Sequence, residues 1–180
     1  MKGWTDKQAF DWSGVTTGAP PPAPDGLYLV RFTASEAEAS ASKKTPMVKL
    51  TLEIGEDEAG NEPKGYSKRL FDNLVFTQAA AWKIKAVAEA AGVPLPLDNS
   101  TESAIEFGNS LLEASKDGIY VRVKQETYTA KSGEERVRAN VARYLTPDEV
   151  KQAKSASSNG MSASSETLRR PRRGAEAAVS

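Results

Sequence analysis

The 180-residue chain contains no cysteine and no histidine, and its 24 Lys and Arg residues balance its 24 Asp and Glu residues. These absences exclude disulfides, thiolate and imidazole zinc sites, and catalytic dyads or triads that need Cys or His. A formal net charge of zero excludes a simple polycation, so affinity for nucleic acid must come from charge segregated on the surface.

The chain has no apolar run near the roughly 20 residues that a membrane helix requires. Its first ten residues also lack the apolar region of a signal peptide. The sequence therefore predicts a soluble intracellular protein with no membrane partner. Because no catalytic or metal-binding motif is found, it also predicts a protein that is not an enzyme and uses no cofactor or metal.

Residues 1–24 are predicted to form an extended N-terminal arm. The Gly-Ala-Pro-Pro-Pro-Ala-Pro run at 18–24 cannot be helical, because proline lacks the backbone N–H and fixes φ. Three aromatic residues, Trp4, Phe10 and Trp12, precede this run. We expect them to pack on the domain that follows; the alternative is that Trp4 or Trp12 stacks on bases.

Five segments are predicted to be β-strands, because apolar and polar residues alternate in them or because turn-forming residues stand at their ends. They cover residues 27–33, 47–54, 65–71, 119–124 and 136–144. Residues 35–44 are expected to form a loop or a hairpin extension. Lys131 to Glu134 are expected to form the turn between the last two strands.

The strongest helix is predicted over 78–91, where Thr77 caps the N-terminus and Gly92 ends the helix. Residues 94–109 are expected to be irregular, with a short helix near 111–114. Thr146-Pro147 opens another short helix, because Thr caps and Pro suits the first helical position. The domain is predicted to span 25–153, and 154–180 to form a disordered, basic, Ser- and Ala-rich tail.

The order of these elements is three strands, one helix and two strands. This is the layout of the OB-fold, a five-stranded β-barrel. The sequence therefore predicts a mainly β protein: a five-stranded OB-like β-barrel with one α-helix between strands 3 and 4.

Basic and aromatic residues gather on the predicted outward face of the strands. Binding to single-stranded nucleic acid needs cations for the phosphates and flat rings for the bases. Exposed Lys and Arg also protect strand edges from aggregation, so the pattern has a second explanation. The predicted DNA-binding residues are Arg31, Lys49, Lys68, Arg69, Tyr120, Arg122, Lys124, Tyr128, Arg136 and Arg138.

Six short stretches between Trp12 and Tyr144 occur in an order typical of one family. They are 25–30 (DGLYLV), 49–54 (KLTLEI), 68–74 (KRLFDNL), the Ala-rich helix ending 90–92 (AAG), 120–123 (YVRV) and 138–144 (RANVARY). In this order they resemble the phage-encoded family known as domain of unknown function 669, regarded as single-stranded-DNA-binding proteins of bacteriophages. The resemblance implies an OB-like barrel that acts in phage DNA replication or recombination in the cytoplasm of a bacterial host cell.

The resemblance also implies phage recombinase or replication proteins as partners, and the sequence leaves a homo-oligomer open. Bacterial single-strand-binding proteins commonly end in an acidic tip that recruits partners. Here 169–173 carry four arginines, so the tail is a candidate for nonspecific DNA affinity instead.

We therefore expect a sequence-tolerant single-stranded-DNA-binding protein. The main alternative is a protein-interaction module, a β-barrel adaptor without direct DNA binding. A nuclease that uses Asp72, Glu53 and Glu56 is disfavoured, because no supporting lysine motif accompanies these carboxylates. The carboxylates of residues 56–62 do not match the spacing of a calcium-binding loop.

Overall fold

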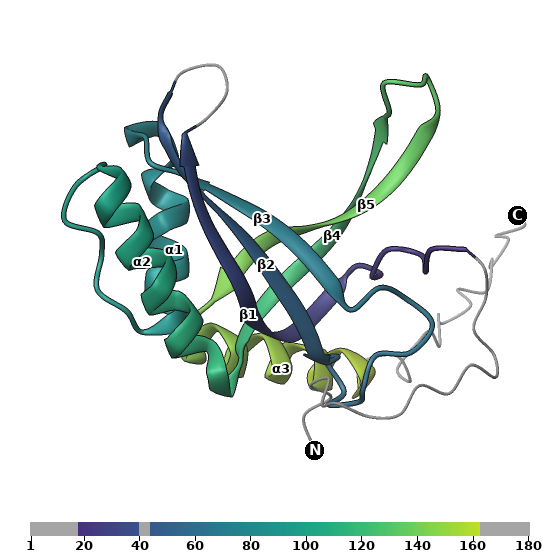
Figure 1. The fold of residues 1–180 in the computed structure, drawn as a ribbon. Coiled ribbons are helices and arrows are strands. Elements are labelled where there is room, and N and C mark those ends of the chain that lie inside the picture. Colours follow the sequence, from purple (N-terminus) through teal and green to yellow (C-terminus); the bar gives the residue numbers. More distant parts are fainter. Residues whose placement is uncertain (1–17, 40–43, 163–180) are drawn as a thin grey trace, which may run out of the picture.

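A computed structural model describes residues 18–39 and 44–162 of the chain (Figure 1). The side chains of 159–162 are outside this description, as are residues 1–17 and 163–180 and with them Trp4, Phe10 and Trp12. The strands are β1 (Gly26–Ala39), β2 (Pro46–Glu56), β3 (Arg69–Val75), β4 (Ile119–Thr129) and β5 (Glu135–Leu145). The helices are η1 (Gln78–Ala80), α1 (Ala81–Ala91), α2 (Thr101–Ala114), η2 (Ser115–Asp117) and α3 (Pro147–Ser162).

The strands form one antiparallel sheet in the order β3-β2-β1-β4-β5, which confirms the prediction of a mainly β fold with five strands. The sheet is strongly curved (Figure 1). Irregular register within the β1–β2 and β4–β5 pairs contributes to this curvature, because a bulge bends and twists its strand.

The sheet is open, whereas the sequence predicted a barrel. β3 and β5 are its two edges, and among the described residues no backbone ladder joins them. The edges nevertheless approach each other, because the Tyr144 hydroxyl on β5 donates a hydrogen bond of 2.6 Å to the Asp72 carboxylate on β3. Side chains thus bring the edges together without pairing their backbones.

Two α-helices, α1 and α2, separate β3 from β4, so the prediction of one helix is wrong. α2 begins at a cap in which the Ser100 hydroxyl accepts from the Ser103 N–H. It buries Phe107 and Leu111 against the sheet. The sequence looked irregular here because small residues replace the usual apolar ones: a Cβ at Gly108 would clash with Ser35 on β1.

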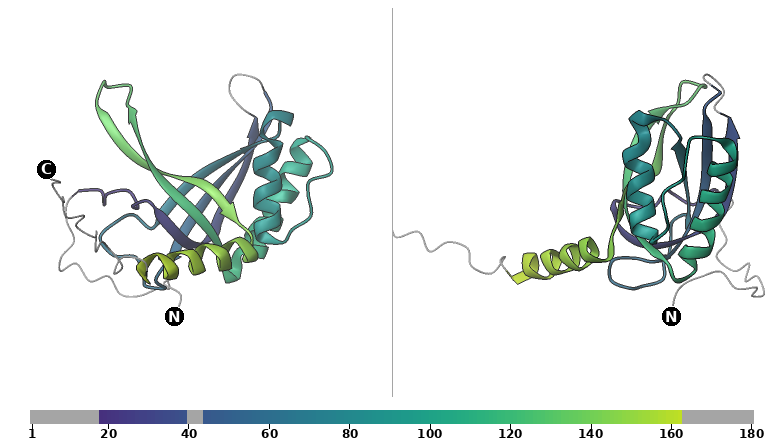
Figure 2. Two further views of the ribbon diagram at one scale, coloured as in Figure 1. Left: turned by 180° about the vertical axis from the view of Figure 1, so that it is seen from behind. Right: turned by 90° about the vertical axis from the view of Figure 1, so that its left-hand side faces the viewer.

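Two predicted boundaries also need correction. The third strand is Arg69–Val75 and not 65–71. β1 continues to Ala39 and pairs there with β2, which is the hairpin extension given as one of two alternatives for this segment. α3 begins at Pro147 as predicted, where Thr146 and Glu149 cap each other reciprocally. It continues to Ser162 and projects away from the sheet (Figure 2), so the predicted start of the tail at 154 is wrong.

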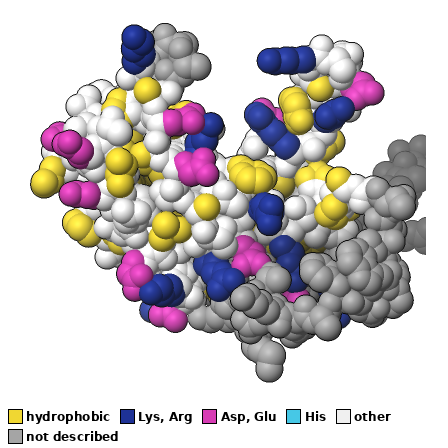
Figure 3. Space-filling model, viewed as in Figure 1, with side chains coloured by type: hydrophobic (Ala, Val, Ile, Leu, Met, Phe, Trp, Pro, Cys, Tyr) yellow, Lys and Arg dark blue, Asp and Glu magenta, His cyan; other side chains and the backbone are white. Residues whose placement is uncertain are grey.

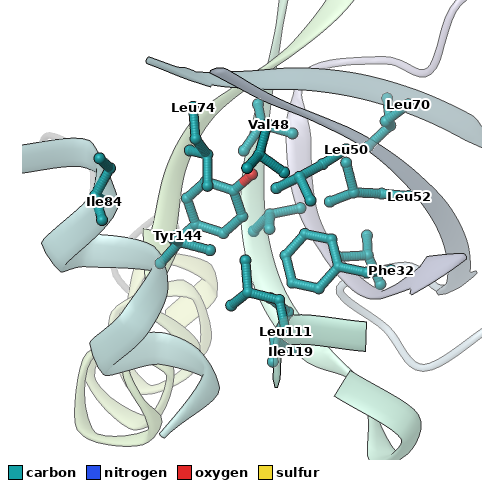
Figure 4. Packing of buried hydrophobic residues seen from close by; sticks show 14 of the residues in the cluster. Phe32, Val48, Leu50, Leu52, Leu70, Leu74, Ile84, Leu111, Ile119 and Tyr144 are labelled. Carbon is teal, nitrogen blue, oxygen red and sulfur yellow. The ribbon is translucent and has the colours of Figure 1, made fainter. Parts of the chain in front are cut away.

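The hydrophobic core lies between the concave face of the sheet and helices α1 and α2 (Figure 4). Val48, Leu50 and Leu52 of β2 point into it and are almost completely buried, which confirms the predicted inward face of this strand. A smaller cluster of Leu27, Leu145 and Val150 fixes the start of α3 to the sheet. Among the described helices, none is long and apolar enough to cross a membrane.

Candidate nucleic-acid interface

A cleft of about 690 Å³ lies between the two edge strands, β3 and β5. We call it the β3–β5 cleft. Hydrophobic and basic side chains occur together in the hollow between the two raised hairpins (Figure 3). The lining residues come from three places: Pro20, Pro22, Ala23 and Ser67; 69–73 of β3 with Lys83 of α1; and 137–141 of β5.

The β3 wall of the cleft presents a cation, an aromatic ring and an amide. Arg69, Phe71 and Asn73 alternate with Leu70 and Leu74, which are buried in the core. The outward residues are consequently exposed, and 65% of the Phe71 surface is open to solvent. Such an exposed ring beside a cation can stack on a base while the cation binds phosphate.

The opposite wall is the unpaired edge of β5. Val137 pairs with Thr127 and lies on the inner face, as alternation predicted, yet it is 45% exposed. The β4–β5 hairpin extends beyond the body of the sheet (Figure 1), and this position accounts for the exposure of Val137. Arg138 and Asn140 complete this wall.

A polar cluster joins β3 and β5, the strands that form the two walls of the cleft. The Asp72 carboxylate accepts from the Tyr144 hydroxyl and from the Lys83 ammonium. Burial, together with the adjacent Asp72 carboxylate, raises the pKa of Tyr144 well above its ordinary value. Tyr144 therefore stays a neutral hydrogen-bond donor to Asp72 and links the two edges.

Five of the predicted cations are ion-paired, which reduces the charge they offer to a phosphate chain. The pairs are Arg31 with Glu53, Lys49 with Glu38, Lys68 with Glu62, Arg136 with Glu134, and Arg138 with Glu126. Hydrogen bonding and charge from Arg138, with a hydrogen bond from Asn140, hold the pKa of Glu126 below its ordinary value. Arg69, Arg122 and Lys124 form no ion pair with another described residue.

The predicted residues lie on more than one surface. Pairing of β4 with β5 puts five of them on one outer face of the hairpin: Arg122, Lys124, Tyr128, Arg136 and Arg138. On this face the Arg138 guanidinium carbon lies 5.1 Å from the centre of the Tyr128 ring. Of all the predicted residues, only Arg69 and Arg138 also line the β3–β5 cleft.

Tyr120 lies under helix α3 and is half-buried. The Lys154 ammonium is 4.6 Å from the centre of its ring and 3.0 Å from its hydroxyl. One ring face is thus occupied by a side chain of the protein, so we leave Tyr120 out of the proposed site. The sequence missed this contact because it placed the end of the domain before Lys154.

Several cleft residues were absent from the predicted set: Phe71, Asn73, Lys83, Val137 and Asn140. A correct register for β3 would have exposed Phe71, because it alternates with the apolar Leu70. Lys83 had no comparable signal, since its place depends on how α1 packs beside β3.

The carboxylates considered for a nuclease do not form a metal site. Among the described residues, no group of three or more Asp or Glu side chains could hold a metal ion. Asp72 is engaged by Lys83, and Glu53 by Arg31.

No protein-family model matches the chain, and no curated protein matches it. The resemblance to the phage family therefore stays a prediction.

Proposed function

We propose that the protein binds single-stranded DNA without sequence preference, in the β3–β5 cleft. The observation that carries this proposal is the exposed Phe71 ring beside Arg69, which has no ion pair with another described residue, on one wall of a cleft between strand edges. Single-strand binders combine basic grooves with exposed rings, because every base can stack whatever its identity.

The arrangement of the sheet supports an OB-like fold for this function. An OB barrel is partly open, and it binds oligonucleotides on the face of strands 2 and 3 and at the loops joining strands 1–2 and 4–5. Here β5 returns beside β3 after the intervening helices, and the β4–β5 hairpin borders the cleft. We infer an open OB-like barrel in which the cleft shares strand β3 with the usual binding face and extends from there to β5.

The cleft suits a single strand by its chemistry as well as its position. Arg69 can neutralise a phosphate without first breaking an ion pair among the described residues. Asn73 and Asn140 add amide groups on opposite walls. If the resemblance to the phage family holds, the protein acts in phage replication or recombination beside a recombinase or replication protein.

The second candidate function is the protein-interaction module, and one observation favours it. Trp82 of α1 is 66% exposed and borders a groove of about 600 Å³ that Leu95, Pro96 and Phe76 also line. Exposed apolar surface of this kind often marks a protein contact. This candidate becomes the better one if the wild-type protein has no affinity for oligo-dT.

Titration of a fluorescent oligo-dT over a range of salt concentrations tests the DNA proposal. Arg69→Ala should weaken binding and flatten the slope of log affinity against log salt by about 0.7, the value for one phosphate. Phe71→Ala should cost about 1–3 kcal/mol with little change in slope, whereas Phe71→Trp should keep the affinity. Lys116→Ala is the control, because this exposed lysine lies in η2, outside the cleft, and among the described residues pairs only with the exposed Glu113 in its own helical segment.

The double variant Arg122→Ala/Lys124→Ala separates the cleft from the outer face of the hairpin. Both side chains are unpaired among the described residues and lie away from the cleft lining. A slope flattened by about 1.4 in this variant, with no effect of Arg69→Ala, would move the DNA site to the outer face.

A further inference from the structure

The chain enters the domain along the rim of the β3–β5 cleft. The Pro21 carbonyl accepts a hydrogen bond of 2.8 Å from the Ser67 N–H, and Ala23 is completely buried. The Gln125 side-chain amide donates to the carbonyls of Pro22 and Ala23 at 3.3 and 3.1 Å. The segment that precedes Gly18 therefore starts from a fixed point beside the cleft.

The cleft leaves apolar surface uncovered. Phe71 and Val137 line it from opposite walls and are 65% and 45% exposed. Burying such side chains is favourable by roughly 25 cal/mol for each Å² removed from water. An aromatic segment tethered nearby can provide this burial.

The preceding sequence contains such a segment, Phe10-Asp11-Trp12. Trp12 lies six residues before Gly18, which gives a reach of about 20 Å in an extended chain. Ser13 and Gly14 are turn-forming residues that allow the chain to double back. In an extended stretch the Phe10 and Trp12 side chains share one face.

The charge of this segment also suits the cleft. Asp11 carries a carboxylate between the two rings, and the cleft wall carries Arg69, which has no ion pair with another described residue. Single-stranded DNA likewise carries aromatic bases on either side of a phosphate, so the same cleft residues could bind either one.

We propose that residues 1–17 dock in the β3–β5 cleft through Phe10 and Trp12 and compete there with single-stranded DNA. The cleft has the size of a pocket for one small ligand, so segment and DNA cannot fill it together. The competition rests on the proposed function, whereas the docking itself does not. Removal of the segment should therefore tighten DNA binding.

Tryptophan fluorescence tests the docking without DNA. The chain has three tryptophans, so Trp82→Phe leaves only Trp4 and Trp12 as reporters. Their emission maximum should lie at a shorter wavelength than that of tryptophan in water, and acrylamide should quench them weakly. Both effects should disappear in Phe71→Ser/Val137→Ser. Circular dichroism and a melting curve like those of the wild type would show that this variant is folded. Equal quenching with and without this double substitution would overturn the docking.

Oligo-dT binding tests the competition. If the segment fills the cleft about 90% of the time, the apparent affinity for oligo-dT is about tenfold weaker than that of the open cleft. Deletion of 1–17 should therefore tighten oligo-dT binding about tenfold. Trp12→Ser should give most of the same gain, and Lys7→Ala is the control that should give none. Weaker or unchanged binding after deletion would overturn the competition.

The two proposals fail in different ways. If no variant binds oligo-dT, the DNA function fails, while the fluorescence result still decides the docking. If the wild type binds oligo-dT but its fluorescence shows no docking, only the inference about the segment is lost.

Discussion

Tyr144 and Asp72 join the two edges of the open sheet through a hydrogen bond of 2.6 Å between the phenol and the carboxylate. The two residues are 72 positions apart, and they lie on strands that do not pair. Their contact therefore links the two strands that form the walls of the cleft.

Tyr144→Phe should destabilise the fold by about 1.5–3 kcal/mol, because it removes a hydrogen bond to a charged group in a buried setting. Urea unfolding followed by circular dichroism measures the change. Tyr128→Phe is the matched control, since its ring is exposed and no described residue hydrogen-bonds to its hydroxyl. Equal stabilities for the two variants would show that the contact does not hold the edges together.

Leu50→Ala should cost on the order of 2–5 kcal/mol, because Leu50 is 1% exposed in the middle of β2 and its truncation leaves a cavity. Leu97→Ala makes the same chemical change where the side chain is 94% exposed, and it should change the free energy of unfolding by less than about 0.5 kcal/mol. Similar losses from both substitutions would contradict the assignment of the core.

Gly108→Ala should destabilise the protein, although alanine stabilises a helix by about 1 kcal/mol relative to glycine. The new methyl group would clash with the Ser35 hydroxyl and lie 3.2 Å from the Ser35 Cβ, and overpacking of this kind costs about 1–3 kcal/mol. Ser35→Ala should recover part of the loss in the double variant, as thermal melting would show. A more stable Gly108→Ala protein would mean that α2 and β1 are not so close.

The Asp98 carboxylate should make the free energy of unfolding depend on pH in the acidic range. Hydrogen bonds from Ser100 and Ser103 lower the pKa of Asp98 to about 2, below its ordinary value. The contribution of the charged carboxylate is thus complete above the unfolded pKa, and it is lost as pH falls through the folded pKa. The stability difference between wild type and Asp98→Asn should be present at neutral pH and shrink as pH falls from 4 towards 2. A stability difference that stays constant from pH 4 to 2 would show that the charge on Asp98 does not stabilise the start of α2.

Much of the sheet could be predicted because its signals are local. Val48, Leu50 and Leu52 alternate with polar residues, and a period of two puts them on one face in any sheet. Thr77 caps η1, the turn that leads into α1, and Gly92 ends α1 in a left-handed backbone conformation that glycine readily adopts. The predicted helix over 78–91 is therefore η1 followed by α1. The same alternation correctly placed Arg122, Lys124, Arg136 and Arg138 on one face of the last hairpin.

Tertiary contacts decided where α2 packs and which side chains line the cleft. α2 depends on the close approach of Gly108 to Ser35, which no period in the sequence reveals. Tyr120 has the pattern of an outward residue, but helix α3 brings Lys154 over its ring. Arg69 and Arg138 form opposite walls of one cleft only because the open sheet curls until Tyr144 reaches Asp72. Local backbone preferences determine which residues form strands and which way each side chain points, whereas packing between distant segments determines which side chains meet.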